Sequence, residues 1–212
     1  LLVIGLFFPI LWLPLLLFGS LFILFIPLKF TVDSIFNLFS VPSQIYKIAT
    51  NPRLRKNHAL EHATVNILEK KLEYNRLAGY ATDNGFYIMG ADSTLEVENA
   101  AKKGLELMKK GKSQLAIHKN CGTSLIVANF ISALIFLFLL LYTGYFSIIS
   151  MLIAIILAHL IGPHLGKLVQ EKFTTTPDVK EMEVISANFD NENYWNRPTK
   201  IFVKTSKIPY IK

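Results

Sequence analysis

The stretch "NHALEHATVNILEKK", residues 57–71, carries the side chains of this chain best suited to chemistry. Two of the five histidines, His58 and His62, lie here with Glu61 directly before the second. On a helix, positions i, i+3 and i+4 share one face, so the three side chains are expected to project together. Two histidines one turn apart can both bind Zn²⁺, and a neighbouring glutamate can act as general base. H-x-x-E-H is the order found in inverted zincin peptidases, although the polar face of an ordinary helix is the alternative.

The third protein ligand of such a metal is expected to come from Glu69, which continues the same helical face, or from His118. Gly122, Thr123 and Ser124, at the expected start of a helix, are predicted to offer backbone N–H groups to an oxyanion or a phosphate. Further candidates for a ligand or site residue are Cys121, Asn66, His159 and His164. A small buried thiol is the alternative for Cys121, and anchoring of a helix end at the lipid headgroups is the alternative for His159 and His164.

Composition places these residues beside a membrane. Hydrophobic residues make up 52% of the chain, which is high for a soluble fold. Residues 1–28 contain no charge and would rise about 42 Å as one helix, more than the roughly 30 Å hydrocarbon core. We expect one spanning helix, with a re-entrant pair broken at Pro9 and Pro14 as the alternative. A signal peptide is disfavoured, because the apolar run is too long and no basic segment precedes it.

A second apolar block, residues 124–158, is too long for one crossing, since it would rise about 52 Å. We predict a helical hairpin that breaks at "YTGY", residues 142–145, where glycine permits a turn and tyrosine suits the interface.

The basic residues predict the orientation in the membrane. All 22 Lys and Arg lie at Lys29 or later, and none lies between Lys119 and Lys167. The positive-inside rule therefore places the charged segments in the cytoplasm, where Cys121 stays reduced. The net charge of +7 indicates attraction to anionic membrane lipids, and no pattern of a nucleic-acid-binding protein is present.

The predicted fold class is a mainly α membrane protein (α+β). It begins with an N-terminal transmembrane segment (1–28) and an interfacial amphipathic segment (29–48). A cytoplasmic α/β insertion (49–123), a transmembrane hairpin (124–166) and a cytoplasmic tail with two strands (167–212) follow.

Local patterns predict the elements within the cytoplasmic parts. Asn51 followed by proline starts a helix over 52–73, and "TDNG" forms a hairpin about Asn84 and Gly85. Ser93 and Glu96 form a capping box for a helix that Gly111 ends, and "SQLAIH" is a short strand. Two further strands, "EMEVISANFD" and "TKIFVKTSK", are joined across "NENYWNRP".

The motifs "NHALEHATVNILE", "AIHKNCGTSL" and "TTTPDV" resemble an uncharacterised bacterial membrane-protein family, a domain of unknown function, over residues 50–185. More distantly, the two longer motifs are similar to the YqhQ-like family of predicted metal-dependent membrane enzymes. That resemblance implies metal dependence but no substrate. It departs at "HKN" before Cys121, where the distant family has proline and arginine. Together with the apolar runs and the positive-inside rule, the bacterial resemblance predicts a multi-pass protein of the bacterial inner membrane.

Three functions remain open on the sequence. The first is a metal-dependent hydrolase of peptide, amide or lipid substrates, with Zn²⁺ expected and Fe or Mn as alternatives. The second is a non-catalytic scaffold that docks a protein partner or a second copy, with or without a structural metal. The third is a di-iron oxidoreductase that would use His58, His62, His159 and His164.

Overall fold

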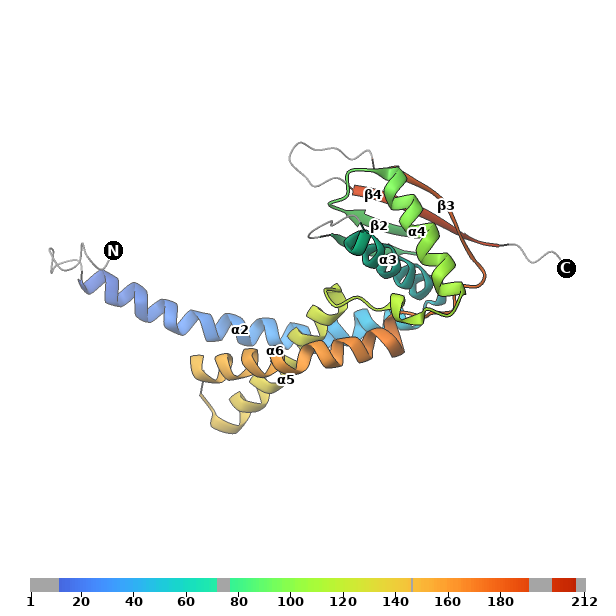
Figure 1. Cartoon of the computed structure of the whole chain (residues 1–212). Helices are drawn as coiled ribbons and strands as arrows, with labels where there is room; N and C mark the ends of the chain where they lie inside the picture. Colours follow the sequence, from blue (N-terminus) through green and yellow to red (C-terminus); the bar gives the residue numbers. More distant parts are fainter. Residues whose placement is uncertain (1–11, 72–76, 146, 191–199, 209–212) are drawn as a thin grey trace. The chain divides into compact units, whose positions relative to one another are not determined.

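The computed structural model of the chain describes residues 12–71, 77–145, 147–190 and 200–208 (Figure 1). Over these ranges the chain is mainly helical with one four-stranded antiparallel sheet, in agreement with the predicted α+β class. The residues form two compact units, which we call the helical unit (described residues 12–41 and 127–162) and the α/β unit (described residues from 42 to 126 and from 163 to 208).

Three helices are long and apolar enough to cross a membrane. They are α2 (Trp12–Ala49), α5 (Gly122–Thr143) and α6 (Ile148–Val169), the last continuing as the π-helical turn η3 (Gln170–Thr174). Large apolar side chains are exposed along them, such as Phe18 at 70% and Leu141 at 85%. Apolar surface of this extent is stable against lipid tails and unfavourable in water, so the helices have the character of membrane spans.

Helix α2 runs through both parts predicted for the N-terminal region. The span predicted over 1–28 and the interfacial segment predicted over 29–48 are joined in one continuous helix of 38 residues from Trp12 to Ala49. Prolines interrupt the hydrogen bonding of a helix without ending it when the flanking residues remain helical, as is common in membrane spans. The predicted kink or re-entrant turn at Pro9 lies outside the described residues.

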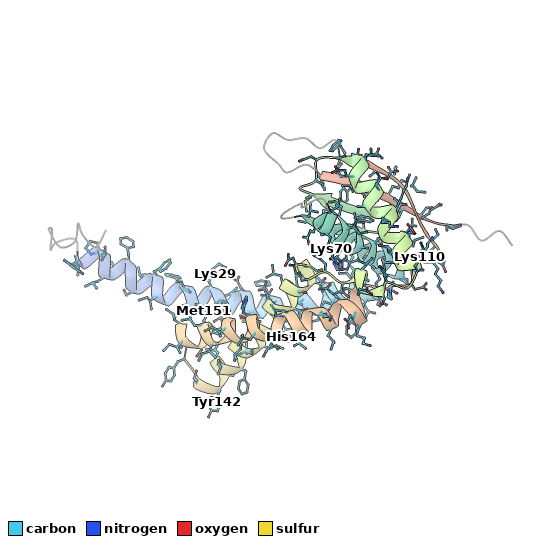
Figure 2. The ribbon with its side chains drawn as sticks, viewed as in Figure 1. Lys29, Lys70, Lys110, Tyr142, Met151 and His164 are labelled. Carbon is cyan, nitrogen blue, oxygen red and sulfur yellow. The ribbon has the colours of Figure 1, made fainter. Side chains whose placement is uncertain are left out.

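The predicted break between the last two spans is confirmed. Helix α5 ends at Thr143 and α6 begins at Ile148, and Gly144 takes φ of 73°, a conformation that glycine adopts without strain. Tyr142, labelled in Figure 2, is 82% exposed at this end of the hairpin. The two helices pack closely through small residues, because a Cβ added to Gly162 would lie 2.6 Å from Cβ of Ala128.

In the α/β unit, helices α3 (Pro52–Lys71) and α4 (Thr94–Lys109) pack side by side against one face of the sheet (Figure 1). The predicted start of α3 is confirmed, since Oδ1 of Asn51 accepts hydrogen bonds from the N–H groups of Arg53 and Leu54, each at 3.1 Å. The helices also meet closely, because a Cβ at Gly104 would lie 3.0 Å from Cβ of Ala63.

The sheet joins two regions that the sequence assigned to separate parts. Its strands are β1 (Ala78–Thr82), β2 (Gly85–Met89), β3 (Met182–Phe189) and β4 (Lys200–Lys207), in the order β1-β2-β4-β3. The two predicted tail strands are confirmed, but β4 pairs with β2, so the tail and the insertion form one folded unit. Buried side chains from both regions, such as Phe86 and Ile201, build the common core. The predicted connection "NENYWNRP" lies outside the described residues.

Two local predictions differ from the structure. The hairpin loop is Asp83–Asn84, one residue earlier than predicted, and Gly85 opens β2 where a Cβ would lie 2.0 Å from the carbonyl oxygen of Val203. The predicted strand "SQLAIH" is instead the 3₁₀ turn η2 (Ser113–Ala116). No strand pairs with this segment in the described chain. Its backbone is held instead by Asn66, whose Nδ2 donates hydrogen bonds to the carbonyl oxygens of Leu115 and Ile117.

Candidate metal centre

Helix α3 places His58 and His62 one turn apart and buries both side chains. Their ring centroids are 4.4 Å apart. The residues between and beside them, Ala59, Leu60 and Ala63, are fully buried in the core, which fixes the rotation of the helix and the direction of the histidine face. Because both histidines are buried, this face is not a solvated helix surface.

Both imidazoles are held by backbone carbonyls through the same ring nitrogen. Nδ1 of His58 lies 2.9 Å from the carbonyl oxygen of Thr174, and Nδ1 of His62 lies 2.7 Å from that of Ala116. Since a carbonyl only accepts, each Nδ1 carries the proton and each Nε2 has a free lone pair. Histidine ligands of metals are usually oriented in this way by a second hydrogen bond.

Burial keeps the two imidazoles neutral, which is the form that binds metals. It lowers the pKa of His58, against the opposing effect of the Thr174 carbonyl. It lowers the pKa of His62 well below the ordinary value, and the neighbouring rings of His58 and His118 lower it further. Nε2 of His62 is buried without a hydrogen-bond partner, which is costly for a polar atom unless something else binds it.

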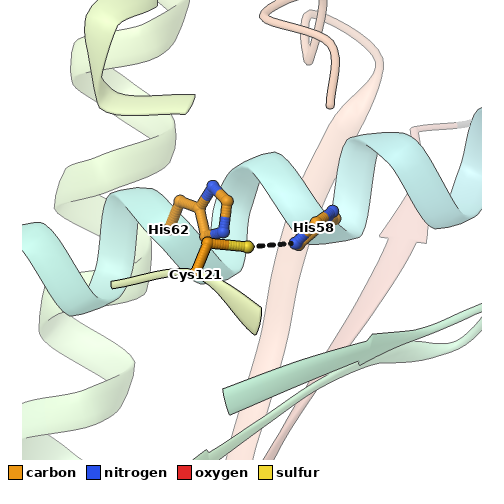
Figure 3. Close-up of side chains that lie close together, drawn as sticks. All are labelled: His58, His62 and Cys121. Atoms are coloured by element: carbon orange, nitrogen blue, oxygen red, sulfur yellow. Dashed lines mark hydrogen bonds between the residues drawn. The ribbon is translucent and has the colours of Figure 1, made fainter. Parts of the chain in front are cut away.

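Cys121, the residue directly before α5, is the third side chain of the group (Figure 3). Its Sγ lies 3.4 Å from Nε2 of His58, and ligand atoms of His58, His62 and Cys121 all lie within 4.8 Å of one another. A tetrahedral zinc with nitrogen and sulfur at about 2.05 and 2.3 Å would separate those two atoms by about 3.6 Å. The separation in the structure is thus close to that of two ligands of one ion.

The thiol is shielded but held in a polar setting. Burial raises the pKa of Cys121, and hydrogen bonding from Thr123, whose N–H donates to Sγ at 3.3 Å, opposes that rise. The thiol is therefore protonated at neutral pH until a cation displaces the proton, as happens when cysteine binds a metal.

Glu61 lies beside the group and is nearly inaccessible to solvent. One carboxylate oxygen is 3.9 Å from Nε2 of His58, and burial raises the pKa of Glu61 to about 8. The other side of the carboxylate touches strand β1, where a Cβ added to Gly79 would lie 2.6 Å from Oε1. A carboxylate that a nearby positive charge could ionise near neutral pH is suited to accept a proton.

The structure changes the predicted ligand set. Nε2 of His118 lies 3.2 Å from Oε2 of Glu69, so these two predicted ligands pair with each other and lie outside the group of three. The His118 ring stays near, with its centroid 6.0 Å from that of His62. Cys121, predicted only as an additional candidate, is the third member of the group, because the turn before α5 points its thiol towards His58.

The remaining candidates have other roles or positions. Asn66 binds the backbone of residues 115–117 and is a structural residue. His159 belongs to the helical unit, and His164 is exposed on α6 (Figure 2), so neither joins the group. Two of the three predicted backbone donors have partners within the chain: the N–H of Thr123 donates to the Cys121 sulfur and that of Ser124 to the Cys121 carbonyl, whereas Gly122 is exposed and lines the same cavity as His58.

Gln170 and Thr174 are site residues that sequence reasoning missed. Gln170 is buried in η3, accepts from the backbone N–H of His118 and donates to its carbonyl at 3.2 Å and to Ser124 Oγ at 2.7 Å. Thr174 supplies the carbonyl for His58. The "TTTPDV" motif, which begins at Thr174, was the available signal, but the sequence does not show which backbone carbonyl will bind a side chain.

Two cavities of the α/β unit border this region. The first, of about 400 Å³, is lined by His58, Glu61 and Cys121 together with strand β1. The second, of about 890 Å³, is lined by more polar residues, including Glu69, Gln170 and three lysines. His118 and Asn120 line both. The group of possible ligands therefore faces a space of the size that small-molecule and peptide sites have.

Comparison with known proteins identifies the family of the chain. The model of a domain of unknown function, DUF6391, matches residues 53–187. The chain belongs to the DUF6391 family. It is similar to an uncharacterized protein of Picosynechococcus sp., with 31% identity over 150 residues that cover 65% of this chain and 73% of the relative. No solved structure matches the chain. The DUF6391 match spans α3, the Cys121 turn and η3, so the family region contains every residue of the candidate metal centre.

Proposed function

We propose that the protein is a membrane-bound, metal-dependent hydrolase with His58, His62 and Cys121 as the ligands of a divalent metal, Zn²⁺ first among them. The observation that carries the proposal is the pair of buried imidazoles whose Nδ1 atoms bond backbone carbonyls. Nε2 of His58 contacts the Cys121 thiol, Nε2 of His62 is buried without a hydrogen-bond partner, and the three side chains offer ligand atoms within 4.8 Å of one another. Two nitrogens and a sulfur suit Zn²⁺ better than Mg²⁺ or Ca²⁺, which prefer oxygen.

Three protein ligands are typical of a catalytic zinc site, because the fourth position stays open for water or substrate. A metal bound there would activate water and polarise the scissile carbonyl or phosphoryl group. Glu61, beside His58, would accept a proton from the water and return it to the leaving group. The positive charge of the ion would also favour the ionised form of Glu61, against the burial that raises its pKa.

The site is proposed to face the cytoplasm of a bacterial inner membrane. The three apolar helices support a membrane location, and the absence of Lys and Arg between Lys119 and Lys167 supports an outer position for the turn between α5 and α6. Membrane lipids would then surround the apolar surfaces of α2, α5 and α6.

The metal is tested by elemental analysis of the full-length protein purified in detergent without added metal. We expect about one zinc per chain, retained in Glu61→Gln and lost in His62→Ala, since only the second change removes a ligand. His159→Ala, outside the group, is the matched histidine control and should keep the metal. A wild-type protein that neither contains zinc nor binds it on titration would refute the proposal.

A structural metal site is the second candidate, favoured by the thiolate ligand and by two further groups close to the ion, Glu61 and His118. If one of them bound as a fourth ligand, the site would be closed. Cobalt-substituted protein distinguishes the two functions: acetohydroxamate should change the visible spectrum of an open site and leave that of a closed site unchanged. The di-iron alternative has no support in the described residues, since the group contains two histidines and His159 and His164 lie outside it.

A further inference from the structure

Strand β1 is an edge of the sheet and borders the candidate metal centre. In the described chain its neighbour in the sheet is β2, on one side alone. Four successive residues, Ala78 to Ala81, line the same cavity as His58, Glu61 and Cys121. An edge strand presents a row of unpaired N–H and C=O groups, which is the surface that another extended chain can bind.

The side chains of β1 leave that edge open. Gly79 faces Glu61, and Tyr80 points to the opposite face, where its ring stacks on Tyr87 with centroids 4.7 Å apart. Apart from Tyr80, the cavity-lining residues of the strand are alanine and glycine, so no large side chain covers the backbone next to the metal ligands.

The register of the hairpin indicates which backbone groups face outward. Thr82 pairs with Gly85 across a two-residue loop, and the pair that flanks such a loop exchanges its hydrogen bonds. Bonded and non-bonded pairs alternate along an antiparallel ladder. Counted from Thr82, the residues whose N–H and C=O groups are expected at the open edge are Ala81 and Gly79, and Gly79 lies against Glu61.

We propose that the substrate is an extended polypeptide segment that pairs with β1 as an additional strand and presents a peptide bond to the metal and Glu61. This inference rests on the proposed hydrolase function. An acyl chain has no groups that could satisfy the open edge, whereas a peptide backbone has them at the matching spacing. Apolar side chains also line the cavity and suit an apolar residue of the bound peptide: Ile48, Leu54, Val65, Leu77 and Ile126.

The reaction is hydrolysis of one peptide bond. The oxygen of water bonds to the carbonyl carbon, the C–N bond breaks, and the products are a carboxylic acid, which keeps the second proton of the water, and an amine. Glu61 takes a proton from the attacking water and delivers it to the leaving nitrogen, so no oxidant, reductant or further reactant is needed.

The test uses hydroxamates, which chelate zinc and cobalt, as probes of the cobalt-loaded full-length protein in detergent. The probes are acetohydroxamate, the hydroxamate of a blocked leucyl-leucine, its backbone N-methylated analogue and dodecanoyl hydroxamate, and the dissociation constants are read from the visible spectrum. We expect the leucyl-leucine probe to bind about tenfold more tightly than its N-methylated analogue, because methylation removes hydrogen bonds to the edge.

A proline variant locates the interaction on β1. Ala81→Pro removes an N–H expected at the open edge and should abolish the difference between the two peptide probes. The matched control is Ile185→Pro in the opposite edge strand β3, at the irregularity between Val184 and Ser186, which should keep the difference. If Ala81→Pro does not fold, the comparison of the two probes on the wild-type protein still decides.

The outcomes separate this inference from the function on which it rests. Failure to bind cobalt or acetohydroxamate would refute the open metal site itself. Binding of acetohydroxamate with equal affinities for the two peptide probes would overturn the peptide inference and leave the hydrolase standing. Tighter binding of dodecanoyl hydroxamate than of the leucyl-leucine probe would overturn it in favour of an acyl substrate.

Discussion

At the scale of single residues, the protein places a carboxyl group where ionisation is unfavourable. Burial raises the pKa of Glu61 from its ordinary value of 4.5 to about 8, so the folded metal-free protein holds this proton at neutral pH. An unfolded chain would release it at a much lower pH. A buried acid of this kind beside two neutral imidazoles is a common feature of functional sites.

The linkage between this proton and folding gives a prediction for Glu61→Gln. Between about pH 4.5 and 8 the native state binds the proton and the unfolded state does not, so the stability of the metal-free protein falls as pH rises. The amide cannot ionise, so the variant lacks this pH-dependent loss of stability. We expect the apparent Tm of Glu61→Gln minus that of wild type to be larger at pH 8 than at pH 5 by about 3 °C or more.

The measurement is thermal unfolding of chelator-treated protein in detergent, followed by circular dichroism. Glu106→Gln is the control: the Glu106 carboxylate pairs with Lys103 and Lys110, which hold its pKa at about 2, so its change should not depend on pH over this range. Equal effects of Glu61→Gln at both pH values would show that Glu61 is ionised in the metal-free protein.

At the scale of elements, the candidate metal ligands depend on contacts between segments far apart in the chain. The π-helical turn η3 supplies the Thr174 carbonyl to His58, and Gln170 in the same turn fixes the backbone at His118. π-helical turns often occur at functional sites. Here the wider turn carries a glutamine that makes two hydrogen bonds to the backbone of His118, before α5, and one to Ser124 in the first turn of α5.

We therefore expect Gln170→Leu to weaken metal binding without removing a ligand. Loss of the three hydrogen bonds frees the segment that carries Cys121, and outer contacts of this kind typically change metal affinity by about 10–100-fold. Competition with a chromophoric zinc chelator measures the change. Gln114→Leu, an exposed glutamine in η2, is the control and should bind zinc as wild type does. An unchanged zinc affinity in Gln170→Leu would remove Gln170 from the site.

At the scale of the whole molecule, three apolar helices and one α/β unit lie on a single chain. The α/β unit is assembled from residues on both sides of the α5–α6 hairpin, because β3 and β4 follow α6 and complete the sheet begun by β1 and β2. If α5 and α6 both cross the membrane, the segments before and after the hairpin return to the same side, as the shared sheet requires.

This topology predicts opposite accessibility for two single-cysteine variants made in a Cys121→Ser background. In intact bacterial cells, a membrane-impermeant maleimide should label Tyr145→Cys, in the turn between α5 and α6, and should not label Lys109→Cys, in α4. After lysis both should be labelled, since both positions are exposed. Labelling of Lys109→Cys in intact cells would place the α/β unit outside the cytoplasm.

The sequence by itself determined the features that depend on near neighbours in the chain. The uncharged runs indicated the three apolar helices, Asn51 and proline set the start of α3, and Gly144 marked the break between α5 and α6. The histidine face of α3 could be predicted as well, because helical periodicity alone brings His58, Glu61 and His62 together.

Only the tertiary structure decided which residues join that face. Cys121 rather than His118 or Glu69 meets the histidines in a turn held by distant contacts: Gln170 bonds the backbone of His118, and the N–H of Cys121 donates to the His118 carbonyl. Strand β4 lies between β2 and β3, where apolar side chains of all three strands are buried in one core. The pairing of strands distant in sequence leaves no local pattern that could predict it. Local periodicity fixes the angle between neighbours on one helix, whereas contacts between segments are set by packing of the complete chain.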